Sequence, residues 1–352
     1  MKTTLCTLHN FYYLDKGLAL YESLTRVAGD FVLYVLAMDD DCFAFLQGCG
    51  YEKLVPIRLS DFENDELRAA KQNRSFGEYC WTCSASLIKY VLDHYGEPAC
   101  AYIDADMFFY ADPAVLFSEL EERGVSVLLT GHRFSRYEKY REAREGRFCV
   151  EFNLFRNDAP ARRLLDTWIA QCLAACSSDA DSGAFGDQQY LSGWADEHAC
   201  VIETRHLGAG VAPWNVAQYR LVSHDPAKEH YRLSVGGQET DLVFFHFAGL
   251  TYLSRTMADI GVYSYWGIDD RFVRPLYWNY LQVLEHYKQL VFDRTGREVL
   301  LKSHPAFERE KQTLAGRVKA LAGRLFAPHG FSHFFRVEVP QKLLRKKNHI
   351  GL

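Results

Sequence analysis

Two aspartates separated by one small residue are the part of this sequence best suited to chemistry. Asp104 and Asp106 follow the apolar run 99–103, and the aromatic-rich run 107–110 follows them. Because residues i and i+2 of an extended chain point to the same face, we expect both carboxylates to converge at the end of a buried strand. A hard divalent cation would relieve their repulsion and leave coordination sites for phosphate oxygens. The alternative is a turn or a helix N-cap, for which Asp is also common.

His246 is the candidate for a third metal ligand. It lies at the end of the apolar run 242–247, and Gly249 follows, where a backbone can approach a ligand closely. An imidazole added to two carboxylates favours Mn²⁺ over Mg²⁺. Arg255 is nine residues further on and could neutralise a diphosphate. The alternatives are a core histidine and a solvated surface arginine.

Three further polar residues occur in suggestive places. Asp187 and Gln188 follow a loop-like segment and could bind hydroxyl groups, although Asp187 could also be a helix N-cap. Glu151 interrupts the apolar run 148–155. A carboxylate within such a run is either paired or functional.

These residues are positioned by strands that alternate with helices. The patterns predict helices over 16–27, 78–94 and 162–176, and strands over 3–8, 31–37, 54–59, 100–109, 125–130, 150–155, 201–204 and 242–247. This alternation predicts an α/β fold with a mixed, mainly parallel twisted sheet flanked by helices. Ligands of such sheets bind at the carboxyl ends of strands, which is where the sequence has Asp104 and Asp106.

Composition narrows the class of protein. The chain has 352 residues, of which 48% are hydrophobic and 24% charged, as expected of a soluble enzyme with a sizeable core. A net charge of −5 gives no reason to expect nucleic acid as a partner. The ten scattered cysteines are expected to be free thiols in a reducing cytosol rather than zinc ligands. With no signal-like N-terminus and no apolar run of ~20 residues, the protein is expected to be cytoplasmic.

The C-terminal segment differs in charge from the rest. Residues 301–352 contain eleven Lys or Arg and three acids, a net charge of +8 in a chain that carries −5 overall. We expect a main domain over 1–295 and a basic helical tail over 296–352, with an amphipathic helix over 306–325. This helix either packs on the domain or lies peripherally on an anionic membrane.

The membrane alternative predicts a change in fractionation. Deleting residues 306–352 should move the protein from membrane fractions to the soluble fraction, because the basic side chains that face anionic lipid are lost. Activity on a soluble acceptor should survive. Equal partitioning of both forms would favour packing on the domain.

Taken in order, these segments resemble the GT-A glycosyltransferases, and among them the family-8-like enzymes. The resemblance covers about residues 3–255. It consists of a strand and tyrosine-containing loop at 7–13, Asp-x-Asp at 104–106, an Asn-ended strand at 150–157, Asp-Gln at 187–188, Trp-Asn at 214–215 and His-x-x-Gly at 246–249. It implies a metal-dependent hexosyltransferase that moves a sugar from a nucleotide-diphosphate sugar, with a UDP-sugar favoured, to a glycan or glycolipid acceptor. Retention of configuration is the favoured outcome.

The resemblance also implies roles for residues. Asp104, Asp106 and His246 would hold Mn²⁺ or Mg²⁺ on the diphosphate, and Asp187 and Gln188 would line the transferred sugar. The residues implied to contact the rest of the nucleotide sugar are Thr7, Asn10, Tyr13, Trp214, Asn215, Gly249 and Arg255.

The chain also departs from the family pattern. The family's lysine six residues after the histidine is replaced by Tyr252, so Arg255 is expected to take over the phosphate contact. Cys149 and Glu151 stand where related enzymes have Asn and Gly, and Glu151 is the candidate catalytic base if the reaction inverts configuration.

Two other functions are compatible with the same residues. One is metal-dependent phosphoryl transfer with Asp104 as the nucleophile, and the other is a non-catalytic carbohydrate-binding protein on the GT-A fold. Mn²⁺-dependent release of UDP or GDP would indicate sugar transfer, whereas phosphate release from generic esters would indicate a phosphatase. Synthesis of a bacterial cell-surface polysaccharide is the process we expect for a sugar transferase with a basic tail.

Overall fold

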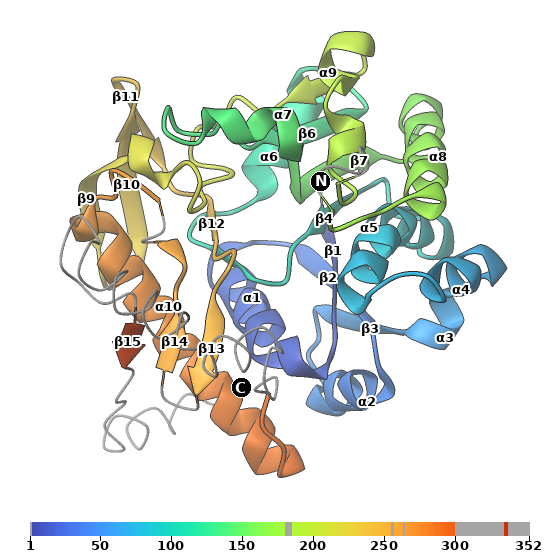
Figure 1. Cartoon of the computed structure of the whole chain (residues 1–352), viewed down its shortest axis with the longest axis horizontal. Helices are drawn as coiled ribbons and strands as arrows, with labels where there is room; N and C mark the ends of the chain where they lie inside the picture. Colours follow the sequence, from blue (N-terminus) through green and yellow to red (C-terminus); the bar gives the residue numbers. More distant parts are fainter. Residues whose placement is uncertain (1, 180–184, 255–256, 263–264, 300–333, 337–352) are drawn as a thin grey trace, which may run out of the picture.

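A seven-stranded sheet forms the centre of the molecule (Figure 1). The computed structural model describes residues 2–179, 185–254, 257–262, 265–299 and 334–336. Across the sheet the strands are β3 (Leu54–Arg58), β2 (Phe31–Ala37), β1 (Thr3–His9), β4 (Ala99–Ile103), β7 (Phe148–Arg156), β6 (Val127–Gly131) and β8 (Val201–Glu203). Only the pairings of β7, with β4 and with β6, are antiparallel. The predicted α/β fold with a mixed, mainly parallel sheet is therefore confirmed.

Both faces of the sheet are covered, which explains why its strands are apolar runs rather than alternating ones. Every residue of β1 and β2 is buried. Leu5 and Leu33 belong to one core, and their neighbours Cys6 and Tyr34 belong to the other. The first core contains α1 (Leu14–Val27), α2 (Asp40–Cys49), α6 (Ala114–Glu122) and α10 (Asp270–Thr295). The second contains α3 (Leu59–Phe62), α4 (Asp65–Lys71), α5 (Phe76–His94), α8 (Ala159–Ala174) and α9 (Trp194–Glu197).

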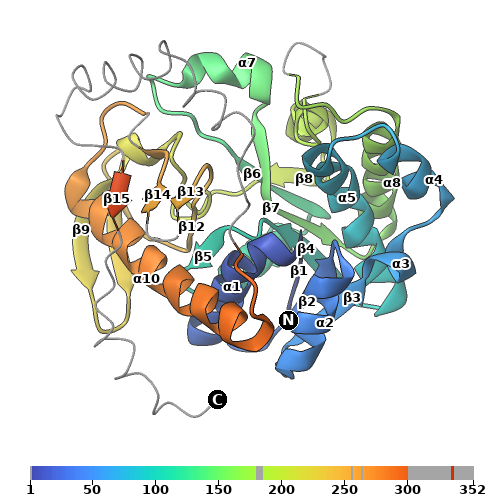
Figure 2. The ribbon, with the colours of Figure 1, turned by 60° about the horizontal axis from the view of Figure 1, so that its bottom comes forward.

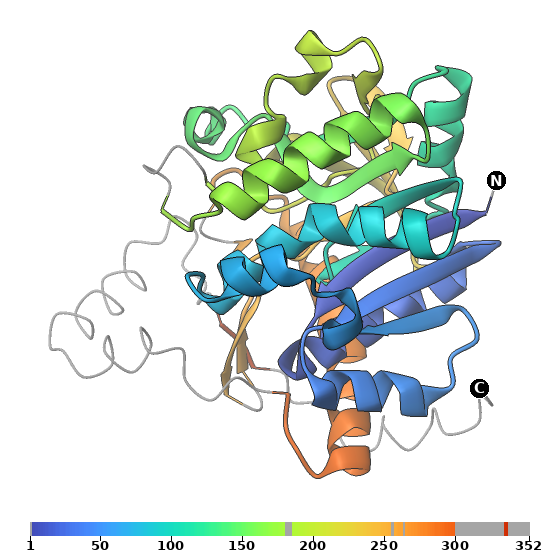
Figure 3. The same ribbon diagram turned by 90° about the vertical axis from the view of Figure 1, so that its right-hand side faces the viewer.

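Helices α5 and α8 lie side by side over the second core (Figure 3). Ser75 and Glu78 form a capping box at the start of α5, and Asp158 caps α8 by accepting a hydrogen bond from the Ala161 N–H. These caps satisfy backbone N–H groups that have no partner within the helix. The two helices begin at 76 and 159, close to the predicted starts at 78 and 162.

The predicted continuous strand over 100–109 is wrong. Strand β4 ends at Ile103, the chain turns over 104–106, and β5 (Met107–Phe109) leaves the main sheet. β5 pairs antiparallel with β12 (Phe244–His246). The carboxylates of Asp104 and Asp106 are thus brought together by a turn rather than by the alternation of an extended strand.

The remaining elements lie beside the main sheet. They are a meander of β9 (Arg220–Asp225), β10 (His230–Val235) and β11 (Gln238–Asp241), a small sheet of β13 (Thr251–Ser254), β14 (Met257–Asp259) and β15 (Phe334–Arg336), and the short helix α7 (Glu142–Glu145). The 26-residue helix α10 packs along α1 (Figure 2). It ends before Gly296, whose φ of +67° is a left-handed conformation that glycine adopts readily.

The predicted helix over 306–325 lies outside the described residues, so its role stays a prediction. Among the helices that are described, none combines the length and apolar character that crossing a bilayer requires.

Candidate active site

The site lies at the carboxyl ends of two adjacent parallel strands, β1 and β4. From β1 the chain continues to β2 and β3 on one side, and it later returns to form β4 on the other side. Such a reversal of strand order opens a crevice where ligands bind. The short helix η1 (Phe11–Tyr13) follows β1, and the turn with Asp104 and Asp106 follows β4.

Backbone pairing brings His246 to this turn although it is 140 positions from Asp106. In the β5–β12 ladder, His246 is the partner of Met107, the residue that follows Asp106. The Phe247 N–H donates a hydrogen bond of 2.9 Å to the Asp106 carbonyl, and the His246 N–H donates one of the same length to Val211. The backbone of His246 is therefore held beside the turn by main-chain hydrogen bonds on both sides of the residue.

Asp104, Asp106 and His246 form a set of potential metal ligands. His246 Nε2 is 3.1 Å from Asp106 Oδ1 and 3.6 Å from Asp104 Oδ2, and one ligand atom from each residue lies within 4.8 Å of the others. The two aspartate side chains keep 31% and 17% of their surface exposed, so further ligands can approach. Two carboxylates and one imidazole are donors that suit Mn²⁺ or Mg²⁺, and the residues present fit the expected cation.

Glu151 holds the other side of the imidazole. Its Oε2 is 2.8 Å from His246 Nδ1, and its side chain is fully buried. We assign a proton to Nδ1 because a carboxylate can only accept this hydrogen bond. A carboxylate behind a metal-binding histidine fixes the orientation of the ring and makes the other nitrogen a better ligand.

A second set of potential ligands shares the same histidine. Cys149 and Glu151 also lie within coordination reach of His246, but all three side chains of this set are buried. Burial raises the pKa of the Cys149 thiol, which disfavours the thiolate that a metal would need. The partly exposed aspartate set is therefore the better metal site.

The ionisable groups of the site shift one another's pKa values. Burial raises the pKa of Asp104 to about 6, with His246 acting in the opposite direction and Asp106 adding to the rise. For Asp106 burial acts to raise the pKa, but the charge and hydrogen bond of His246, together with the charge of Lys16, act in the opposite direction, and the pKa is lowered. Burial alone would lower the pKa of His246, but Asp106 and Glu151 raise it well above the ordinary value. The neighbouring carboxylates thus favour the protonated imidazole, and a bound metal would displace its Nε2 proton.

Asp187 lies beyond Asp104, in front of the helix η4 (Gln189–Leu191). Its Oδ2 accepts a hydrogen bond of 2.5 Å from Ser84 of α5, and its carbonyl accepts one of 2.8 Å from the Trp168 indole of α8. Burial raises the pKa of Asp187 to about 7, against the effect of the Ser84 hydrogen bond, and the charge of Asp104 adds to the rise. Gln188 is partly buried and donates its side-chain amide to the Glu145 carbonyl.

The residues expected to face the nucleotide lie in different environments. Asn10 and Tyr13 are partly buried in the segment after β1, whereas the Thr7 side chain is fully buried within β1. The Trp214 ring stands edge-on to His246, with ring centroids 5.5 Å apart. Asn215 is fully buried, and its amide donates hydrogen bonds to the carbonyls of His132 and Gly210. Thr7 and Asn215 are therefore held inside the fold, and the segment after β1 remains the candidate for nucleotide contact.

Two further predicted positions follow the histidine. Gly249 has a φ of +80°, a conformation that favours glycine. Arg255 lies outside the described residues.

Three residues that the motifs do not predict lie beside the site. The Lys16 ammonium is 4.3 Å from the centroid of the Tyr13 ring and 4.8 Å from that of Tyr252. The Tyr252 hydroxyl donates a hydrogen bond to the fully buried carboxylate of Asp15. One sequence feature could have indicated Asp15 and Lys16. They are a charged pair in the first turn of a helix whose next residues, 17–20, are glycine, alanine and leucine.

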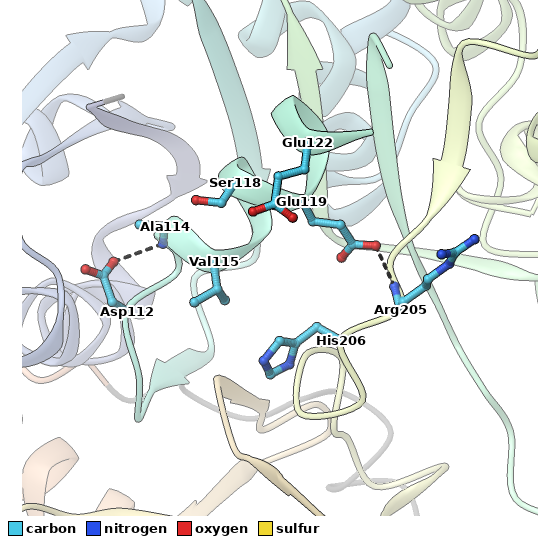
Figure 4. A pocket seen from close by; sticks show the side chains of 8 residues that line it. All are labelled: Asp112, Ala114, Val115, Ser118, Glu119, Glu122, Arg205 and His206. Atoms are coloured by element: carbon cyan, nitrogen blue, oxygen red, sulfur yellow. Dashed lines mark hydrogen bonds between the residues drawn. The ribbon is translucent and has the colours of Figure 1, made fainter. Parts of the chain in front are cut away.

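A separate pocket lies over α6 and the segment after β8 (Figure 4). It is lined by Asp112, Ala114, Val115, Ser118, Glu119, Glu122, Arg205 and His206. This pocket shares no residue with the potential metal ligands Asp104, Asp106 and His246. Glu119 is already engaged there, because its carboxylate accepts hydrogen bonds from Thr204 and from the Arg205 N–H.

Comparisons with known proteins identify relatives by sequence. No family model matches the chain. The uncharacterized protein YfnD of Bacillus subtilis (strain 168) is 31% identical over 280 residues, which cover 78% of this chain and 86% of YfnD. The uncharacterized protein YfnF of the same strain is 29% identical over 259 residues, which cover 72% of this chain and 84% of YfnF.

The similar solved structures include several glycosyltransferases, the class that the sequence resembles. Galactosyltransferase LgtC in complex with donor and acceptor sugar analogs is 14% identical with a TM-score of 0.48, over 88% of this chain and 100% of that chain. The apo form of mouse xyloside xylosyltransferase 1 is 14% identical with a TM-score of 0.43, over 60% of this chain and 87% of that chain.

Proposed function

The chain belongs to the family of Bacillus subtilis YfnD, and for this member of the family we propose a metal-dependent glycosyltransferase activity. The enzyme would transfer a hexose from a nucleotide-diphosphate sugar, with a UDP-sugar favoured, to a glycan or glycolipid acceptor. The observation that carries this proposal is the arrangement around His246. Its Nε2 faces Asp104 and Asp106, and its Nδ1 is held by Glu151.

We propose one role for each group of residues in the site. Asp104, Asp106 and His246 would hold Mn²⁺ or Mg²⁺, which when bound supplies positive charge to the leaving nucleoside diphosphate. Asp187 and Gln188 would contact the hydroxyl groups of the transferred sugar. Ser84 and Trp168 keep the Asp187 segment in place.

Glu151 is better suited to positioning than to base catalysis. Its side chain is fully buried and its carboxylate faces the imidazole, so an acceptor hydroxyl cannot reach it while this contact persists. An inverting reaction would need a general base beside that hydroxyl. We therefore propose that the reaction proceeds with retention.

A ligand screen tests the proposed function. With Mn²⁺ present, one UDP- or GDP-sugar should raise the melting temperature, because a ligand that binds the native state stabilises it. The same compound should release UDP or GDP slowly in water and faster with an acceptor, and EDTA should stop both reactions. Phosphate release from p-nitrophenyl phosphate would instead indicate a phosphatase. No stabilisation by any nucleotide sugar would contradict the proposal.

A further inference from the structure

The Lys16 side chain is a nearly buried cation whose ammonium has no hydrogen-bond acceptor among the described residues. Only 4% of the side chain is exposed. Its ammonium has three N–H donors, yet the one carboxylate of the described residues within 4 Å of it is that of Asp15, whose Oδ1 at 3.8 Å is too far for a hydrogen bond. Asp15 compensates part of this charge, but the N–H donors of the ammonium are left for an acceptor that is not part of the described fold, and an anion would supply it.

The surroundings of Lys16 hold the ammonium in place. Tyr13 and Tyr252 present their rings to it at 4.3 and 4.8 Å, and cations are attracted to the faces of aromatic rings. Tyr252 is in turn tied to α1, because its hydroxyl donates to Asp15. The cation is therefore positioned by α1 and β13 together, and little side-chain entropy remains to be lost when a ligand binds.

Lys16 also lies beside the candidate metal site. Its helix α1 packs against β5, the strand that follows Asp106, and Ser23 of α1 accepts a hydrogen bond from the Phe109 N–H of β5. In agreement, burial and the charges of Asp106 and Asp104 raise the pKa of Tyr13, whose ring Lys16 contacts. An anion between Lys16 and a cation on the aspartates would contact both positive charges at once. A diphosphate has the charge and the several oxygens that such a bridging position requires.

We propose that Lys16 binds the diphosphate of the nucleotide donor, opposite the cation held by Asp104, Asp106 and His246. This inference rests on the proposed function and adds a binding residue to it. The role is one that the sequence resemblance assigns to the position of Tyr252. Here the tyrosine would support the lysine instead of contacting the phosphate itself.

Lys288 of α10 provides a comparison at the same ring. Its ammonium is 4.7 Å from the centroid of the Tyr252 ring, a distance similar to that of Lys16. It differs in having a close carboxylate partner, Glu285, at 2.5 Å. A cation that is already paired has less to gain from a phosphate, so Lys288→Met serves as the matched control.

The test measures two affinities in the full-length protein with Lys16→Met. Mn²⁺ alone should bind the variant somewhat more tightly than the wild type, because a positive charge near Asp106 has been removed. UDP or GDP, titrated in saturating Mn²⁺, should bind roughly 10- to 100-fold more weakly, because charge-assisted hydrogen bonds to the phosphate are lost. Lys288→Met should leave both affinities within about threefold of wild type.

Tighter binding of Mn²⁺ together with weaker binding of nucleotide would distinguish a phosphate-binding role of Lys16 from a purely structural one. If Lys16→Met weakens Mn²⁺ and nucleotide binding equally, or lowers both together with the melting temperature, Lys16 only supports the fold and the proposal is overturned. Unchanged nucleotide binding by a folded variant also overturns it while leaving the glycosyltransferase proposal intact. If the wild type with Mn²⁺ binds neither UDP nor GDP, both proposals fail. Lys16→Arg, which keeps the charge, should recover part of the lost nucleotide affinity.

Discussion

Replacing Asp106 with alanine is expected to abolish Mn²⁺-dependent nucleotide binding while leaving the fold intact. Asp106 is the carboxylate nearest to His246 Nε2, at 3.1 Å, so the variant loses a direct ligand and the partner of the imidazole. Loss of an outer-shell partner typically reduces metal affinity by 10- to 100-fold. Loss of a direct ligand should therefore reduce Mn²⁺ affinity by more than about 100-fold, measured by titration calorimetry or by electron paramagnetic resonance of free Mn²⁺.

The matched control for this variant is Asp166→Ala. Asp166 is an exposed aspartate of α8 that pairs with Lys89, with 58% of its side chain accessible. The Asp166→Ala variant should bind Mn²⁺ and nucleotide as the wild type does, and it should melt within about 4 °C of the wild type, as is usual for changes at the surface. The Asp106→Ala variant should still unfold in a single cooperative transition, which shows that its loss of binding is not a loss of the fold. Wild-type Mn²⁺ affinity in a folded Asp106→Ala protein would refute the metal assignment.

Glu151→Gln is expected to weaken Mn²⁺ binding by about 10- to 100-fold, although this side chain is not among the proposed ligands. Glutamine has nearly the same size, but its NH₂ group can donate a hydrogen bond to Nδ1. Nδ1 would then act as an acceptor, and the imidazole proton would move to Nε2, where it blocks the metal. Nitrogen NMR of the metal-free histidine at alkaline pH would report this change of tautomer directly.

Cys149→Ser separates the two possible ligand sets around His246. If the metal is held by the aspartates, this variant should keep Mn²⁺ affinity within about threefold, since the thiol is then only a neighbour of the imidazole. A loss as large as that of Asp106→Ala would show that the buried Cys149–Glu151 set is the true site.

For Glu151→Gln, an unchanged Mn²⁺ affinity would contradict the proposed positioning role of Glu151.

Much of the fold could be predicted because the central strands are buried on both faces. The runs 31–37 and 3–8 contain almost nothing but apolar and small residues, and the observed strands match them to within one residue. The meander over 220–241 could not be predicted from pattern, because β9 is largely exposed and shows no clear alternation. The sequence does not predict helix α10 either, since its residues include Pro275 and many polar side chains.

The candidate site was only partly predictable for a related reason. Its chemistry-bearing residues stand out by type, so Asp104, Asp106, His246 and Glu151 could be selected from the sequence. What joins them is non-local pairing: β5 with β12 brings in His246, and β4 with β7 brings Glu151 alongside Asp104. The position of the Lys16 ammonium at the Tyr252 ring depends on the packing of Tyr252 against α1. No local spacing in the sequence indicates this contact.

The ladder between β5 and β12 also sets the time at which the site is completed during synthesis. Domains emerge from the ribosome N-terminal part first. A nascent chain that has reached only β8 contains both aspartates and Glu151 but not the imidazole, whose strand is about 40 residues further on. The full ligand set can therefore form only when most of the domain has been made, and a cation bound there would fasten the late part of the chain to the early part.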